Sequence, residues 1–230
     1  MNFLERLLRS ESSPVEAMIT DVTQMSGDKV CIAGLTRRSA IRLSEPTPRQ
    51  GWLDSIGGLA PGDVVNLNWR PARRYRRPHG EDGTWNPSTL VKTSTLPTEN
   101  FFERLEAGAL RSIVDAFGRP WFYSERGNPA FKPDRGSRSL ATVKVHFATV
   151  YGHGDGIRVD FRDDKTTWTM VPVEDLALRR RRPPEGLNYS ETILRAGLGR
   201  PFQANDKPAA CYLQVNHILE CGEESKGVVQ

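Results

Sequence analysis

The chain has 230 residues and a mass of 25.8 kDa, which suits one large domain or two small ones. Hydrophobic residues make up 37% of it, which argues against one large, deeply buried core and favours two of modest size. The net charge of +4 permits an anionic partner without requiring one.

The first residues predict an N-terminal helical extension over 1–14. Phe3, Leu4, Leu7 and Leu8 follow helical spacing with charged residues between them, which is unlike the apolar region of a signal peptide. No apolar run approaches the roughly 20 residues that cross a bilayer, so we expect no membrane partner. The three cysteines form neither a CxxC pair nor an even set, which favours a reducing cytoplasm.

Residues 15–96 have the pattern of a small β-barrel. Strands are expected at 17–22, 29–35, 40–43 and 64–69, separated by turns rich in Gly, Pro and Asp. The period then changes, because apolar residues from Phe101 to Phe117 recur every three or four positions. A connector over 97–136 is therefore expected to hold an amphipathic helix or a broken pair of helices, followed by a loop at 124–139.

The β pattern resumes over 137–221. Strands are expected at 140–147, 157–161, 166–172 and 210–218, with one helical turn at 173–178 and a short helix at 187–197. Residues 222–230 are expected to be a flexible tail. The predicted fold is mainly β with short helices: two OB-like β-barrels in tandem, joined by a helical segment.

Two arginine-rich segments are the strongest indications of function. In the first, five arginines surround Tyr75; they are Arg70, Arg73, Arg74, Arg76 and Arg77. The second is the run Arg179, Arg180, Arg181 and Arg182. Arginine forks match phosphate oxygens and tyrosine offers a stacking face, so both segments are candidate nucleic-acid contacts. The alternative is a solvated loop whose arginines pair with Glu81 and Asp82, and a charged linker that keeps the protein soluble.

The sequence contains no recognisable catalytic or metal constellation. The four histidines are far apart, without paired-ligand spacing, and no nucleotide-loop, nucleophile-elbow or kinase signature is present. We therefore expect no catalytic residues, no metal and no cofactor. Asp160, Asp163 and Asp164 cluster at a strand end, where acids are normally solvated. Of the adjacent aromatics Trp121, Phe122 and Tyr123, at least one should be exposed or cover the junction between modules, because successive side chains of a strand point to opposite faces.

Several ordered segments resemble the bacterial dual OB-domain family. They are 29–35, 41–43, 59–65, 78–82, 197–202 and 211–218, and the match spans roughly Met18 to Leu219. The resemblance implies two OB-like barrels in one compact unit and an inferred nucleic-acid-binding function. It supplies no agreed active site.

Three hypotheses follow. The first is a non-enzymatic protein that binds nucleic acid, with single-stranded DNA or RNA favoured, through the two arginine segments. The second is an interaction subunit that docks onto a larger nuclease, helicase or defence-type assembly. Its apolar contact patch would combine Trp121, Phe122 and Tyr123 with the helix expected from Phe101 to Phe117. The third, an enzyme or small-ligand sensor, would need a concave pocket joining the two halves, and the sequence gives it little support.

Overall fold

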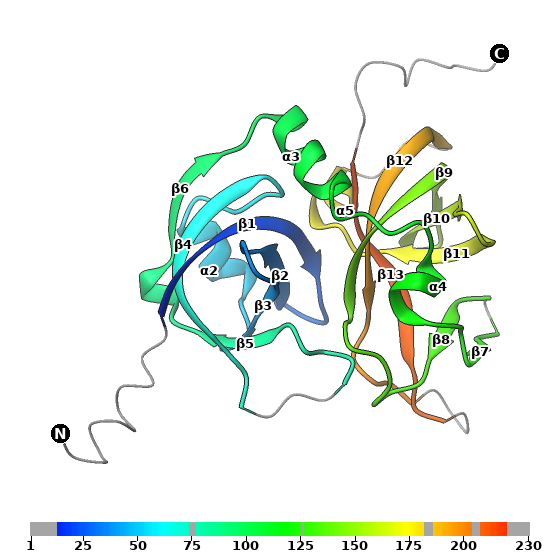
Figure 1. Cartoon of the computed structure of the whole chain (residues 1–230), viewed down its shortest axis with the longest axis horizontal. Helices are drawn as coiled ribbons and strands as arrows, with labels where there is room; N and C mark the ends of the chain where they lie inside the picture. Colours follow the sequence, from blue (N-terminus) through cyan, green and yellow to red (C-terminus); the bar gives the residue numbers. More distant parts are fainter. Residues whose placement is uncertain (1–12, 74–76, 126, 182–185, 204–207, 220–230) are drawn as a thin grey trace.

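The computed structural model describes residues 13–73, 77–125, 127–181, 186–203 and 208–219 (Figure 1). The helix expected at the N-terminus and the C-terminal tail lie outside the described residues, apart from the last positions of the extension. Of the candidate site residues, Arg74, Tyr75, Arg76 and Arg182 also lie outside them. None of the described helices is long and apolar enough to cross a membrane.

The first barrel is a closed, five-stranded sheet. Its strands are β1 (Ser13–Gln24), β2 (Val30–Leu35), β3 (Ala40–Glu45), β4 (Asp63–Pro71) and β5 (Asp82–Trp85). They pair in the order β1-β2-β3-β5-β4, and β1 closes the barrel by pairing with β4. The helix α2 (Gln50–Ser55) lies between β3 and β4, and β6 (Val91–Thr95) pairs with the outer part of β4 after a short 3-10 turn (Pro87–Thr89). Apolar side chains from every barrel strand fill the interior, so this module has its own core.

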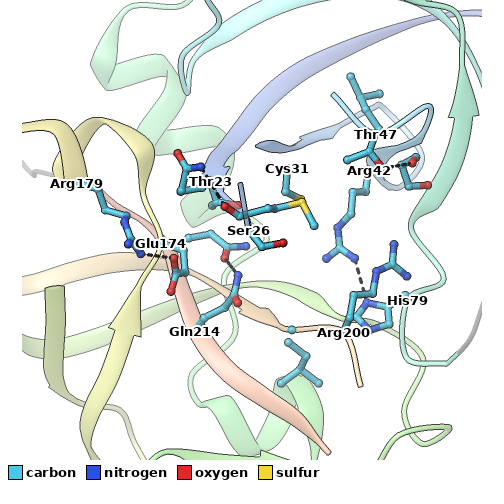
Figure 2. Close-up of a pocket in the computed structure, with 17 residues that line it drawn as sticks. Thr23, Ser26, Cys31, Arg42, Thr47, His79, Glu174, Arg179, Arg200 and Gln214 are labelled. Atoms are coloured by element: carbon cyan, nitrogen blue, oxygen red, sulfur yellow. Dashed lines mark hydrogen bonds and ion pairs between the residues drawn. The ribbon is translucent and has the colours of Figure 1, made fainter. Parts of the chain in front are cut away.

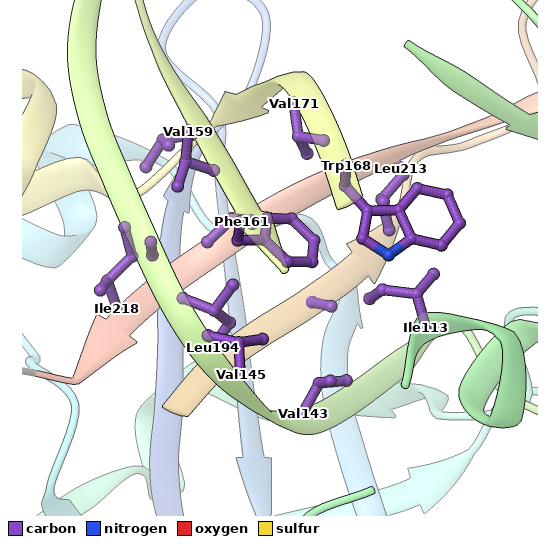
Figure 3. Packing of buried hydrophobic residues seen from close by; sticks show 14 of the residues in the cluster. Ile113, Val143, Val145, Val159, Phe161, Trp168, Val171, Leu194, Leu213 and Ile218 are labelled. Atoms are coloured by element: carbon purple, nitrogen blue, oxygen red, sulfur yellow. The ribbon is translucent and has the colours of Figure 1, made fainter. Parts of the chain in front are cut away.

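The second barrel is also closed and five-stranded. It contains β9 (Leu140–His153), β10 (Gly156–Arg162), β11 (Thr167–Val173), β12 (Leu187–Leu198) and β13 (Cys211–Leu219). A parallel contact between β11 and β13 completes the ring. Phe161 and Trp168 stack inside it among branched side chains from β9, β12 and β13 (Figure 3). The helix α5 (Leu176–Arg181) follows β11, and β7 (Phe122–Tyr123) with β8 (Pro129–Phe131) extends the sheet beyond β13. The predicted fold, two OB-like barrels with few helices, is confirmed.

The connector contains a broken pair of helices, as one of the two expected arrangements predicted. The helix α3 (Thr98–Glu106) ends before Gly108, and α4 (Ile113–Phe117) begins at an N-cap whose Ser112 hydroxyl accepts from the Asp115 N–H. The predicted loop at 124–139 also contains β8, which pairs with β13.

The helix expected at 187–197 is wrong, because this segment is strand β12. It pairs with β9 on one side and β13 on the other. Leu194, Ala196 and Leu198 enter the barrel core, while Ile193 and Arg195 face the other barrel. A strand buried on both faces loses the polar–apolar alternation that distinguishes it from a helix.

Buried contacts join the two barrels, which lie side by side in Figure 1. A small apolar cluster combines Met18 of β1 with Ile193 and Leu219 of the second barrel and two residues of α3. Beside it, the Arg195 guanidinium bonds both oxygens of Asp21 at 3.1 and 2.8 Å, with both side chains almost fully buried. These contacts fix the relative position of the barrels.

A second buried network completes the junction. Arg42 of β3 donates to Asp82 at 3.1 Å and to the Ser139 hydroxyl at 3.0 Å, and lies 3.0 Å from Nδ1 of His79. Glu81 accepts from the backbone N–H groups of Ser139 and Leu140. Burial, followed by the Arg42 and Arg200 charges, lowers the pKa of His79 to about 3, so this imidazole is neutral near neutral pH.

Candidate nucleic-acid interface

A basic groove of about 600 Å³ lies where the connector meets the second barrel. The segment after α4 contributes Arg119 and Trp121, and the loop between β8 and β9 contributes Lys132, Arg135 and Arg138. All five side chains belong to exposed residues. No acidic side chain lines this groove among the residues that the structure describes. The groove is therefore suited to a polyanion rather than to a cation.

A second hollow of about 650 Å³ continues from the groove into the junction between the barrels. The two share Ser137 and Arg138. Arg38, in the turn between β2 and β3, and Arg104, near the end of α3, are exposed residues in the wall of this hollow. We call the connected surface the basic track, defined by Arg38, Arg104, Arg119, Lys132, Arg135 and Arg138.

The positive charges of the basic track are not neutralised by acids of the residues that the structure describes. Within the described part of the chain, none of its six cations forms an ion pair; the pairs that the structure does show involve other residues. Arg195 also lines the junction hollow, but Asp21 neutralises it. Glu81 is the acid in that wall, and it already accepts from Ser139 and Leu140. A polyanion would therefore displace counterions from the track, not protein carboxylates.

The first arginine segment lies beside this track. Pro71 lines the junction hollow and Pro78 lines the groove, so one described residue on each side of positions 74–76 borders the track. Arg73 and Arg77 are exposed there, and the Arg77 carbonyl accepts from the Asp134 N–H of the facing loop. Arg70 is half-buried on β4 and has a partner of its own. The alternative in which arginines of this segment pair with Asp82 is not seen among the described residues. The Asp82 carboxylate instead pairs with Arg42 and Arg200.

The described members of the second arginine run lie on α5, away from the track. Arg179 pairs with Glu174 at 2.5 Å, and Arg180 lies 3.9 Å from Asp54. Arg181 ends α5, and its side chain lies outside the described residues. Arg179 lines a different cleft, so the described members of the two runs do not line a common surface.

The aromatic triplet divides between the groove and the protein interior. Trp121 is 42% exposed in the groove wall, and the Lys132 ammonium lies 4.8 Å from the centre of its ring. Phe122 is half-buried, in edge contact with both Trp121 and Tyr212. Tyr123 is 56% exposed. The expectation that at least one of the three is exposed is confirmed.

Sequence reasoning missed all six cations of the basic track. Lys132, Arg135 and Arg138 were visible as three basic residues within a short loop rich in Gly and Pro. Arg38, Arg104 and Arg119 had no such signal, because each comes from a different element. The acid cluster differs as well: Asp163, expected in solvent, is buried and bonds the N–H of Ile113 and the indole of Trp168. Among the described residues, no group of three possible metal ligands occurs.

Comparison with known proteins gives only distant likenesses. No family model and no curated protein sequence matches the chain. The p204 HINb domain is 12% identical, covers 89% of this chain and 97% of its own, and has a TM-score of 0.38. The Ifi202 HINa domain in complex with 20bp dsDNA is 10% identical, with 90% and 97% covered and a TM-score of 0.37. A murine DNA binding protein bound with ds DNA is 11% identical, with 94% and 100% covered and a TM-score of 0.35. Likenesses this weak decide nothing about this chain, whose two barrels follow from its own strand pairing.

Proposed function

We propose that this protein binds nucleic acid without catalysing a reaction, and that a single strand of DNA or RNA lies along the basic track. The proposal includes membership of the bacterial dual OB-domain family and a cytoplasmic location. The observation that carries it is the arrangement of six exposed cations along two connected hollows, none of them paired with an acid within the described residues.

Phosphate binding follows from the chemistry of these side chains. Arginine presents a planar fork that matches two phosphate oxygens, and five of the six cations are arginines. Each phosphate that a single strand places on such a cation releases counterions, so the logarithm of affinity falls with the logarithm of salt by about 0.7 per contact. A strand that touches all six cations would bind tightly at low salt and weakly at high salt.

Trp121 supports a single strand over a duplex. Its exposed ring lies in the wall of the groove, where an unpaired base could stack on it. Lys132 covers that ring now, and a phosphate would draw the ammonium away from it. Bases in a duplex are stacked on one another and offer no free face. Two of the distantly similar structures hold double-stranded DNA, so duplex is the competing ligand in the test.

The test is fluorescence anisotropy with labelled single-stranded DNA, RNA and duplex across a salt series. Arg135→Ala combined with Arg138→Ala should weaken single-strand binding and reduce the salt slope by about 1.4, for two lost contacts. The matched control is Arg162→Ala, an exposed arginine at the end of β10 that lines neither hollow. Full affinity in the double variant, or an equal loss in the control, would overturn the assignment.

Trp121→Ala tests the choice of polymer. Stacking on one base contributes about 1–3 kcal/mol, so single-strand affinity should fall by roughly five- to 150-fold, while duplex affinity should change little. Equal losses for both polymers would count against a single strand. Arg73→Ala with Arg77→Ala, measured in the same way, tests whether the neighbouring arginine segment also contacts the strand.

The alternative function is that of a subunit in a larger nuclease, helicase or defence-type assembly. Two exposed aromatic residues favour it: Tyr123 on β7 and Phe202, which is 62% exposed and bridges to Ala210 just before β13. Burial of such rings is insensitive to salt, whereas phosphate contacts weaken. A partner complex that survives high salt and is lost in Tyr123→Ala with Phe202→Ala would support this alternative.

A further inference from the structure

A cleft of about 540 Å³ lies between the two barrels, separate from the basic track. One wall comes from the first barrel, through the end of β1, the β1–β2 turn and β3. The other comes from the second barrel, through Glu174, the end of β12 and β13. Among the described lining residues, Leu198 is the one that the cleft shares with the groove of the basic track, and none is shared with the junction hollow.

Both walls of this inter-barrel cleft are rich in hydroxyl and amide groups. The first barrel contributes the hydroxyls of Thr23, Ser26 and Thr47, and the second contributes the amides of Gln214 and Asn216. Figure 2 shows Ser26 and Gln214 on one side of the opening, facing Arg42 and Arg200 on the other. Such groups form hydrogen bonds with sugar hydroxyls and with the polar edges of bases. Because they occur on both walls, the cleft suits a polar ligand rather than an apolar one.

Two guanidinium groups at one end of the cleft, Arg42 of the first barrel and Arg200 of the second, share one carboxylate. Asp82 pairs with Arg42 through one oxygen, at 3.1 Å, and with Arg200 through the other, at 2.5 Å. The Arg200 side chain remains about half exposed, although Asp82 itself is buried. Glu81, the other acid beside Arg42, is satisfied by Ser139 and Leu140. An oxyanion at Arg200 would therefore meet a donor group that its partner carboxylate does not fully occupy.

Arg42 provides an independent indication of a missing acceptor. This residue is 7% exposed and lines the cleft. Its terminal nitrogens bond Asp82 and Ser139, but its Nε has no hydrogen-bond partner among the described residues. A buried donor without an acceptor costs roughly 1–3 kcal/mol, so such a group normally has a partner. This Nε is itself closed to solvent, so the half-exposed Arg200 guanidinium is the group that a ligand oxyanion in the cleft would meet first.

We propose that the inter-barrel cleft binds a nucleoside monophosphate unit, with its phosphate at Arg200 and Arg42 and its sugar and base toward the hydroxyl and amide walls. The volume suits it, since ligand pockets of about 300–1,000 Å³ hold molecules of this size. The unit has two sources of the same chemistry: a free nucleotide, or the phosphorylated end of a strand. The free-nucleotide form stands whether or not a strand occupies the basic track; the strand-end form rests on the proposed function.

Titration calorimetry on the full chain tests this proposal. The ligands are the common ribonucleoside 5′-monophosphates, the matching nucleosides, inorganic phosphate, and trinucleotides with and without a 5′-phosphate. We expect saturable binding of a monophosphate or of the phosphorylated trinucleotide, weakened by at least about tenfold when the phosphate is removed. Binding of the free monophosphate identifies a nucleotide ligand, whereas binding of the phosphorylated trinucleotide alone identifies a strand end.

Two variants assign the binding to the cleft. Arg200→Ala removes the exposed guanidinium, and Ser26→Trp fills the opening from an exposed turn without entering either core. Each should weaken binding by at least about tenfold. Arg162→Ala, on β10 and outside both the cleft and the basic track, should leave it unchanged. The proposal is overturned if no phosphorylated ligand binds saturably, if binding persists in Ser26→Trp, or if Arg135→Ala abolishes it, which would place the ligand on the basic track instead.

Discussion

Removal of Arg195 should strongly destabilise the protein, because this side chain neutralises a buried carboxylate between the barrels. The guanidinium makes two bonds to Asp21, one to the Thr142 hydroxyl at 2.7 Å and one to the Thr20 hydroxyl at 3.1 Å. Arg195 is 2% exposed. In Arg195→Met the Asp21 charge stays buried, with the Thr20 hydroxyl as its remaining donor in the described network. Breaking a buried pair in this way costs about 3–5 kcal/mol.

The assay is urea unfolding of three variants. They are Arg195→Met, Asp21→Leu and the double variant that combines the two substitutions. Because replacing both charges leaves neither buried alone, the double variant should recover most of the free energy of unfolding that Arg195→Met loses. The exposed Arg49–Asp28 pair is the control, and Arg49→Ala should cost less than about 1 kcal/mol. A loss below about 1 kcal/mol in Arg195→Met, or losses that simply add in the double variant, would refute the reasoning.

Two further predictions concern buried polar groups. His79 has a folded-state pKa of about 3 against 6.5 when exposed, so only the unfolded chain takes up its proton as the pH falls below about 6.5. Stability should therefore fall between about pH 6 and pH 4, and the difference in unfolding free energy between the native protein and His79→Asn should shrink over that range; a constant difference would contradict the assignment. Asp163 accepts from the N–H groups of Ile113, Lys165 and Thr166 and from the Trp168 indole. Asp163→Ala should cost about 3 kcal/mol or more in thermal unfolding, since it leaves buried donors without an acceptor, and a cost under about 1 kcal/mol would show that water replaces the carboxylate.

Strands with one buried face could be predicted from the sequence, and strands without that asymmetry could not. In β10, buried Ile157, Val159 and Phe161 alternate with partly exposed residues, and the predicted strand at 157–161 is present. In β6 all five side chains are exposed, so no apolar pattern marks it; backbone bonds to β4 hold it in place. The strand β12 fails for the opposite reason, because it is buried on both faces. Side-chain patterns report burial, whereas strand pairing depends on the backbone.

The candidate site shows the same limit in terms of charge. The sequence reveals arginines when they are close together in the chain, as at 70–77 and 179–182. The basic track depends instead on convergence: Arg38 is in a hairpin turn, Arg104 on a helix and Arg119 after another helix. The closed barrels and their buried junction bring these residues together. Conversely, the four consecutive arginines of the second run predict a polyanion site from the sequence. In the structure, however, Glu174 lies beside Arg179 and Asp54 beside Arg180.

A final prediction concerns the length of the nucleic-acid strand that the basic track binds. The track has two halves, Arg38 with Arg104 in the junction hollow and Arg119 with Arg135 in the groove, and Arg138 belongs to both. A strand of about 12 nucleotides should contact both halves. Alanine substitution of either pair removes two phosphate contacts and should therefore lower the salt dependence of its affinity by about 1.4 in slope. A strand of about 4 nucleotides should settle at Trp121, so only the groove pair and Arg138→Ala should weaken it.

Anisotropy with both lengths separates the possibilities. If both pairs weaken the short strand equally, the ligand occupies one compact site and does not follow the track. If the junction pair affects neither length, the path ends at Arg138 and the first barrel contacts no phosphate there. The Arg195–Asp21 pair fixes the two halves of the track relative to one another. Arg195→Met should therefore reduce the affinity of the long strand more than that of the short one. This comparison is made without denaturant, under conditions where both barrels of the variant remain folded.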